Sequence, residues 1–118
     1  MRDGWQAIAT VNETGWHRLW PLADLAAGQM RCIAIDGREL LVCHTRLGLY
    51  AVDNVCSHAE TRLSEGRLRG TRLVCPLHGA SFDVRTGAVL AAPATRPLAT
   101  HAVRVVDGII EIRAGAAA

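Results

Sequence analysis

The sequence predicts an all-β domain built from small antiparallel sheets. Three observations favour this fold class: short segments in which apolar and polar residues alternate, glycine-containing turns between those segments, and no long stretch with helical periodicity. The chain has 118 residues, which is enough for one modest hydrophobic core. We therefore expect residues 1–118 to form a single domain.

The strand pattern recurs along most of the chain. The segments that carry it are 16–20, 29–35, 39–44, 49–52, 67–69, 72–75, 81–84, 88–90, 101–106 and 109–113. Only residues 22–27 look helical, and that segment is short. Residues 1–15 match no motif, and we expect them to form a loose N-terminal arm.

The last two segments make the clearest hairpin. Asp107-Gly108 between them suits a two-residue type I′ turn. The implied register gives two apolar pairs and one pair of opposite charge: Val103 with Ile112, Val105 with Ile110, and Arg104 with Glu111. Apolar pairs on one face and a charged pair on the other predict a two-sided strand pairing.

The charge pattern excludes a nucleic-acid-binding protein. Thirteen arginines and no lysines face eleven acidic residues spread along the same stretches, so the formal charge is only +2. We interpret the group Arg62, Arg67, Arg69 and Arg72 as a solvated face, with a docking rim as the alternative.

No apolar run approaches the roughly 18 residues of a membrane span. The N-terminal residues also lack an export signal, so we expect a soluble, cytoplasmic protein with no membrane partner.

The most informative motif is a pair of short segments, Cys56-Ser57-His58 and Cys75-Pro76-Leu77-His78, separated by sixteen residues. A Rieske [2Fe-2S] cluster takes two thiolates on one iron and two imidazoles on the other, and each segment offers one ligand of each kind. A structural zinc ion accepts the same mixture, but zinc fingers usually group like ligands together. We therefore predict one [2Fe-2S] cluster, for which the cofactor-binding and metal-ligating residues are Cys56, His58, Cys75 and His78.

The surrounding residues strengthen this interpretation. Tyr50-Ala-Val-Asp-Asn54 and Gly79-Ala-Ser-Phe-Asp83 closely resemble Rieske ferredoxins and the related small subunits of bacterial oxygenases, and the resemblance runs from about Trp16 to Arg113. It implies the Rieske iron–sulfur fold, with two cluster-binding hairpin loops. Pro93 and Pro97 mark a further loop. The resemblance implies that this loop covers the cluster, and the alternative is an ordinary loop before the final hairpin.

Sequence differences from the high-potential members of that family narrow the range of possible functions. Rieske subunits of cytochrome bc complexes have a disulfide-forming Cys where this chain has Leu77, and they have Ser and Tyr where it has Ala80 and Phe82. Fewer hydrogen bonds to the cluster leave its reduced form less stabilised. The resemblance thus implies a potential toward the low end of the roughly −150 to +300 mV range of Rieske centres.

A low-potential, single-domain carrier resembles the ferredoxin component of a bacterial ring-hydroxylating dioxygenase system. Such a ferredoxin is an electron-transfer component and not an enzyme, and it has no catalytic residues of its own. The resemblance implies two partners, a flavoprotein NAD(P)H reductase that supplies electrons and a terminal oxygenase that receives them, and we expect a monomer. The alternatives are the ferredoxin of a diiron monooxygenase and the small subunit of assimilatory nitrite reductase.

The remaining cysteines and histidines are expected to lie outside the cluster. Cys32 and Cys43 flank the Asp36-Gly37 turn. They face each other only if the loop is Gly37-Arg38; a loop at Asp36-Gly37 sets Cys32 opposite Leu41. We expect two buried thiols, with a disulfide as the alternative. The other histidines lack a Cys at the needed offset, and we exclude them as ligands: His17, His44 and His101.

Overall fold

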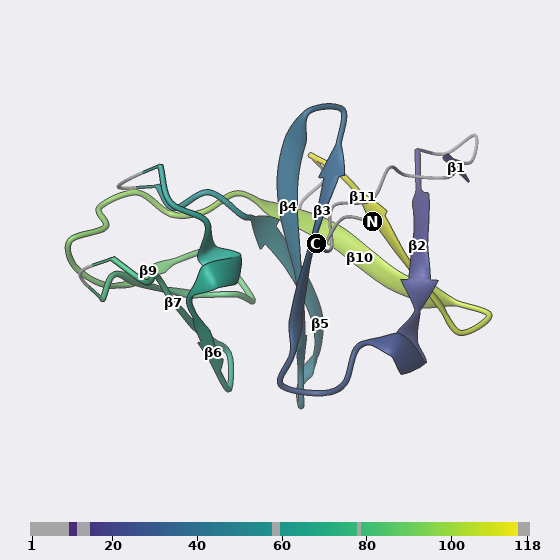
Figure 1. Cartoon of the computed structure of the whole chain (residues 1–118), viewed down its shortest axis with the longest axis horizontal. Coiled ribbons are helices and arrows are strands. Elements are labelled where there is room, and N and C mark those ends of the chain that lie inside the picture. The colour runs from purple at the N-terminus through teal and green to yellow at the C-terminus, as the bar shows by residue number, and fades with distance from the viewer. Residues whose placement is uncertain (1–9, 12–14, 58–59, 78, 116–118) are drawn as a thin grey trace.

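Two antiparallel sheets organise the protein in the computed structural model, which describes residues 10–11, 15–57, 60–77 and 79–115 (Figure 1). The strand order of the larger sheet is β1 (Thr10–Val11), β2 (His17–Pro21), β11 (Ile109–Arg113), β10 (Thr100–Val106), β5 (Gly48–Asp53), β4 (Arg38–Thr45) and β3 (Met30–Ile35). The strand order of the smaller sheet is β6 (Arg67–Arg69), β7 (Arg72–Val74), β8 (Ser81–Asp83) and β9 (Val89–Ala91).

The ten predicted strands are all present, and their ends differ from the prediction by at most one residue. Two expectations hold only in part. The segment 22–27 is helical over its first three residues, the 3-10 helix η1 (Leu22–Asp24), and the backbone is already extended at Leu25. The loose arm is contradicted at Thr10 and Val11, which pair with β2 and so satisfy backbone groups at the edge of the larger sheet. A second 3-10 turn, η2 (Leu63–Glu65), was not expected.

The hairpin between β10 and β11 has the predicted register. Val103 lies opposite Ile112, and Arg104 lies opposite Glu111. Asp107 and Gly108 both have positive φ, 53° and 76°, as a type I′ turn requires.

The charged pair of this hairpin belongs to a larger network. Glu111 is almost fully buried, at 2% exposure. Its carboxylate accepts hydrogen bonds from Arg104 at 2.9 Å and from Arg18 of β2 at 3.0 Å. Both arginines therefore compensate the buried charge of Glu111, and the bond from Arg18 links the β10–β11 hairpin to β2.

The β3–β4 hairpin resolves the position of the two extra cysteines. Asp36 and Gly37 have φ values of 51° and 78°, so these two residues form the turn. Cys32 therefore lies opposite Leu41, and Cys43 lies opposite Met30. Both cysteines are free thiols, as expected, but only Cys43 is buried, whereas Cys32 is half-buried. Burial raises the pKa of Cys43 to about 12, so this thiol is protonated at neutral pH.

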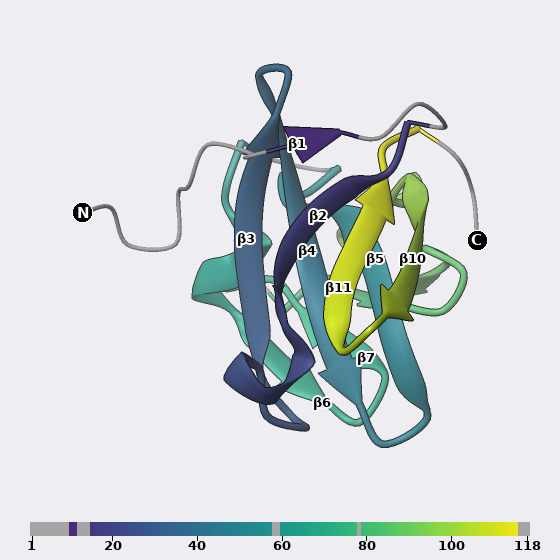
Figure 2. The same ribbon diagram turned by 90° about the vertical axis from the view of Figure 1, so that its right-hand side faces the viewer.

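Strand β4 is buried on both faces and separates two cores. The larger sheet curves so that β2 and β11 face β3 and β4 (Figure 2). The core inside this curve includes Leu40 and Val42, whereas Leu41 and Cys43 point to a second core shared with the smaller sheet. This explains why the sequence Leu40-Leu-Val-Cys43 is apolar throughout instead of alternating.

The second core holds the candidate site. It packs Leu41 and Val52 of the larger sheet against Leu73 and Phe82 of the smaller sheet, and it includes Cys56. No helix in the part of the chain that the structure describes is long and apolar enough to cross a bilayer.

Candidate metal centre

Two loops carry the predicted ligands, and both are closed at the base in the same way. In the first loop, residues 55–62, the backbone N–H of Cys56 donates to the carbonyl of Thr61 at 2.9 Å. In the second loop, residues 75–80, the N–H of Cys75 donates to the carbonyl of Ala80 at 2.7 Å. Each cysteine thus begins a tight loop whose far end lies five residues on. The other two predicted ligands, His58 and His78, lie outside the described residues.

The two loop cysteines are brought together in the second core. Cys56 is 4% exposed and Cys75 is 2% exposed, and the two thiols lie within hydrogen-bonding reach of each other. Neither belongs to a disulfide. Burial raises the pKa of the Cys75 thiol, and the neighbouring Cys56 raises it further. The backbone N–H of Leu77, 3.4 Å from Cys75 Sγ, lowers this pKa, but the net shift is upward.

This donor set fits a soft metal. Two sulfur atoms that are buried, close together and unbridged have no role in a disulfide, and thiolates are the ligands that iron–sulfur clusters and zinc prefer. The N–H of Leu77 pointing at Cys75 Sγ suits a sulfur that carries negative charge. The described residues therefore fit the thiolate half of a Rieske site.

The proline-containing loop lies against the first ligand loop. Ala94 and Leu98 are buried in the same core as Cys56 and Cys75. Outside the core, the Ser57 hydroxyl donates to the Arg96 carbonyl at 2.6 Å, and the Arg96 guanidinium donates to the Ser57 carbonyl at 3.0 Å. We call this reciprocal contact the Ser57–Arg96 clasp. Sequence reasoning missed it, because the two residues are 39 positions apart and neither belongs to a recognisable pair.

Two of the histidines excluded as ligands make other contacts. His101 is fully buried, and its Nδ1 accepts the N–H of Gly115 at 2.8 Å, so its Nε2 carries the proton and donates to Asp53 at 2.9 Å. The ring of His44 bonds the carbonyl of Leu25 through Nδ1 at 2.7 Å. Both rings therefore form hydrogen bonds that stabilise the larger sheet.

Asp53, at the end of β5, links the two strands on either side of it, β10 through His101 and β4 through Arg38. Besides His101, it accepts a bidentate pair of hydrogen bonds from Arg38, at 3.0 and 3.3 Å. Burial raises the pKa of Asp53, but the hydrogen bonds from His101 and Arg38 outweigh burial and hold the pKa below its usual range.

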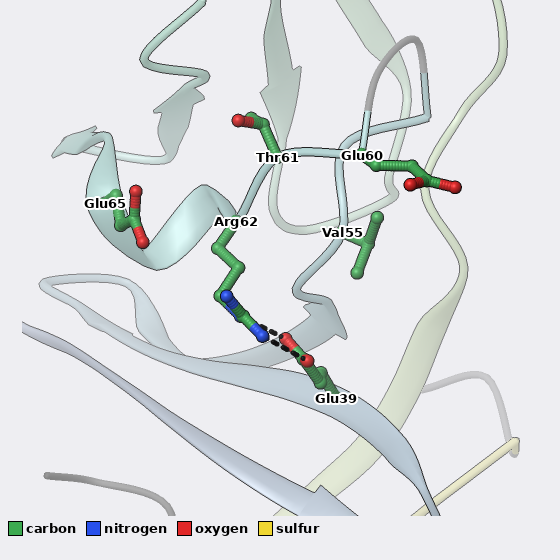
Figure 3. A pocket seen from close by; sticks show the side chains of 6 residues that line it. All are labelled: Glu39, Val55, Glu60, Thr61, Arg62 and Glu65. Atoms are coloured by element: carbon green, nitrogen blue, oxygen red, sulfur yellow. Dashed lines mark hydrogen bonds and ion pairs between the residues drawn. The ribbon is translucent and has the colours of Figure 1, made fainter.

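The first ligand loop is also anchored to the larger sheet. Arg62, at the end of the loop, donates two hydrogen bonds to Glu39 of β4, at 2.9 and 3.1 Å. The pair lies among the residues that line a hollow of about 420 Å³, together with Val55, Glu60 and Glu65 (Figure 3). Arg62 is exposed, as expected for a solvated face, and its ion pair with Glu39 also anchors the end of the ligand loop to β4.

Comparison with known proteins agrees with this geometry. Residues 15–102 match the model of the Rieske [2Fe-2S] domain. The ferredoxin component of the naphthalene 1,2-dioxygenase system of Pseudomonas putida is 37% identical over 90 residues, which cover 76% of this chain and 86% of that protein. The anthranilate 1,2-dioxygenase ferredoxin subunit of Burkholderia cepacia is 34% identical over 107 residues, which cover 91% of this chain and 97% of that protein.

A solved structure is similar in fold and in sequence. A chain in the complex of reduced oxygenase and oxidised ferredoxin in carbazole 1,9a-dioxygenase superposes with a TM-score of 0.83 at 31% identity. The superposition covers 88% of this chain and 96% of that one.

Proposed function

Because this chain belongs to the Rieske [2Fe-2S] domain family, we propose that it binds one [2Fe-2S] cluster through Cys56, His58, Cys75 and His78. The observation that carries the proposal is the pair of buried, unbridged cysteines at the start of two similarly closed loops, each followed at short spacing by a histidine. When bound, such a cluster accepts and releases one electron.

The chain's own residues set the surroundings of that electron. The sulfurs of Cys56 and Cys75 lie in a core that excludes water, and the N–H of Leu77 is placed to stabilise negative charge on one of them. Ala80 and Phe82 are fully buried in the same core and carry no hydroxyl group. Since no donor replaces those hydroxyls at these positions, we place the potential toward the low end of the Rieske range.

The function that this site supports best is one-electron transfer. We infer that the protein is the ferredoxin component of a ring-hydroxylating dioxygenase system, in which a flavoprotein NAD(P)H reductase supplies electrons and a terminal oxygenase consumes them. The support is the set of relatives described above, which are ferredoxins of naphthalene and anthranilate dioxygenase systems, and the similarity to a ferredoxin seen in complex with its oxygenase. We place the protein in the cytoplasm as a monomer, with no membrane partner and no nucleic-acid partner.

Reconstitution tests this function. The purified protein is mixed with NADH and with the flavoprotein reductase and oxygenase encoded beside its gene. We expect reduction of the protein to require the reductase, and hydroxylation of an aromatic substrate to require all three components. A system that turns over equally fast without this chain would contradict the proposal.

A further inference from the structure

A groove runs along the outer face of the smaller sheet toward the second ligand loop. Its volume is about 670 Å³. Three arginines line it, Arg67, Arg69 and Arg72, together with Cys75 and Gly79 of the ligand loop. The groove therefore joins a concentration of positive charge to the loop that carries two of the four proposed ligands.

Strand register places the three arginines on one face. Arg69 lies opposite Arg72, and Arg67 lies opposite Val74, the residue before Cys75. Because side chains alternate along a strand, Arg67 and Arg69 share a face with their cross-strand partners. The intervening residues turn to the other face, where Leu73 is fully buried.

Unlike five other arginines of the described residues, these three form no ion pair with a described carboxylate. Within the described part of the chain, five other arginines bind carboxylates: Arg18, Arg38, Arg62, Arg85 and Arg104. Arg67 and Arg69 are exposed and form no ion pair with a described residue, and Arg72 donates to the hydroxyl of Ser81.

Nearby acids do not cancel this charge. Glu65 is the one carboxylate among the lining residues that the structure describes. Asp83, which lies opposite Arg72 on β8, is held by Arg85 at 2.9 Å. The groove therefore keeps a net positive charge.

We propose that Arg67, Arg69 and Arg72, here called the basic face, dock a carboxylate-rich surface of the protein that exchanges electrons with the cluster. The proposal rests on the proposed function. Guanidinium groups bind carboxylates in a bidentate fork, and an uncompensated patch of one sign steers a partner of opposite sign. A partner held on this face lies beside the second ligand loop. Among the described residues that line the groove, none has an aromatic side chain on which a base could stack, which disfavours nucleic acid.

The position of the face is tested with a redox-inert anion. Hexacyanochromate(III) is paramagnetic and broadens the amide signals of residues near which it dwells. We expect broadening centred on Gly66, Arg69, Gly70 and Gly79, and we expect it to disappear in Arg67→Glu/Arg69→Glu. Broadening spread evenly over the surface would overturn the proposal.

The link to electron exit is tested with two small oxidants. The reduced cluster gives one electron to ferricyanide, which becomes ferrocyanide, or to tris(phenanthroline)cobalt(III), which becomes the cobalt(II) complex. At low ionic strength we expect Arg67→Glu to slow the reaction with the anionic ferricyanide about tenfold and to accelerate the reaction with the cationic cobalt complex. The difference should shrink at high salt, where charges are screened.

A matched control separates the local effect from net charge. Arg113→Glu changes the total charge equally, on β11 of the larger sheet, at an exposed residue that forms no ion pair with a described residue. Equal rate changes in Arg113→Glu and Arg67→Glu would overturn the proposal. Unchanged ferricyanide rates, together with loss of binding to a labelled single-stranded DNA in Arg67→Glu, would assign the face to nucleic acid and also overturn it.

The visible spectrum distinguishes these results from failure of the proposed function. A variant with a normal cluster spectrum and unaltered rates contradicts only the docking proposal. A wild-type protein without a cluster spectrum contradicts the proposed function.

Discussion

Removing the Ser57 hydroxyl tests how the first ligand loop is held. Ser57→Ala deletes the 2.6 Å hydrogen bond to the Arg96 carbonyl and leaves the 3.0 Å bond from the Arg96 guanidinium in place. One hydrogen bond between neutral groups contributes about 0.5–1.5 kcal/mol, and about 1.4 kcal/mol changes an equilibrium tenfold. The loop should therefore open roughly two to ten times more often. Because the Cys56 N–H bonds Thr61 at the base of this loop, hydrogen exchange of a peptide covering residues 55–62, measured by mass spectrometry, should accelerate by that factor.

The control removes hydroxyl hydrogen bonds from another turn. Thr45→Val deletes two bonds between β4 and β5: the Thr45 hydroxyl donates to the Gly48 carbonyl at 2.9 Å and accepts the N–H of Leu47 at 3.0 Å. Exchange in residues 55–62 should stay as in the wild type. Equal exchange of that peptide in Ser57→Ala and in the wild type would refute the assignment of the clasp as a support of the ligand loop.

Three further predictions concern potential, acid stability and backbone conformation. Ala80→Ser and Phe82→Tyr should each raise the reduction potential, measured by voltammetry, by a few tens of millivolts. A charge-assisted hydrogen bond is worth roughly 1.5–3 kcal/mol, and about a third of it would favour the reduced cluster over the oxidised one, at about 59 mV per 1.4 kcal/mol. An unchanged or lower potential would mean that these residues do not face the cluster. Asp53 has a lowered pKa in the folded state, so its contribution to stability is present above its unfolded pKa of about 3.9 and is lost as pH falls. In urea unfolding, the stability of Asp53→Asn should therefore decrease less below about pH 4 than that of the wild type. An equally steep decrease in both proteins would contradict this. Gly87→Ala should cost at least about 2 kcal/mol in the same assay, because φ is +80° and the new Cβ would lie 2.1 Å from the carbonyl oxygen of Leu98; a wild-type midpoint would show that the loop adapts.

Local chemistry made most of the fold predictable from the sequence. Asp107-Gly108 sets a two-residue turn, and once the turn is known the register of β10 and β11 follows. At Asp36-Gly37 the same reasoning left two registers open, because either Gly37-Arg38 or Asp36-Gly37 could form the loop. Positive φ at both Asp36 and Gly37 decides between them.

Contacts between distant segments could not be predicted in this way. The pairing of Thr10–Val11 with β2 depends on an open sheet edge and not on a strand pattern in those two residues. Arg62 was grouped with the other arginines between the ligands, but only the fold brings it to Glu39. The charges of Arg67 and Arg69 are evident from the sequence. That the two side chains share a face with Arg72 follows only from the register of β6 and β7.

Electron paramagnetic resonance of the reduced protein is the sharpest test of the proposed four-ligand cluster. We expect a brown protein that bleaches on reduction and then shows the rhombic spectrum of a Rieske centre, with one cluster per chain. His58→Ala and His78→Ala should each lose this spectrum, whereas His44→Ala should keep it. A colourless protein that holds zinc, or a normal Rieske spectrum in His78→Ala, would contradict the assignment of the four ligands.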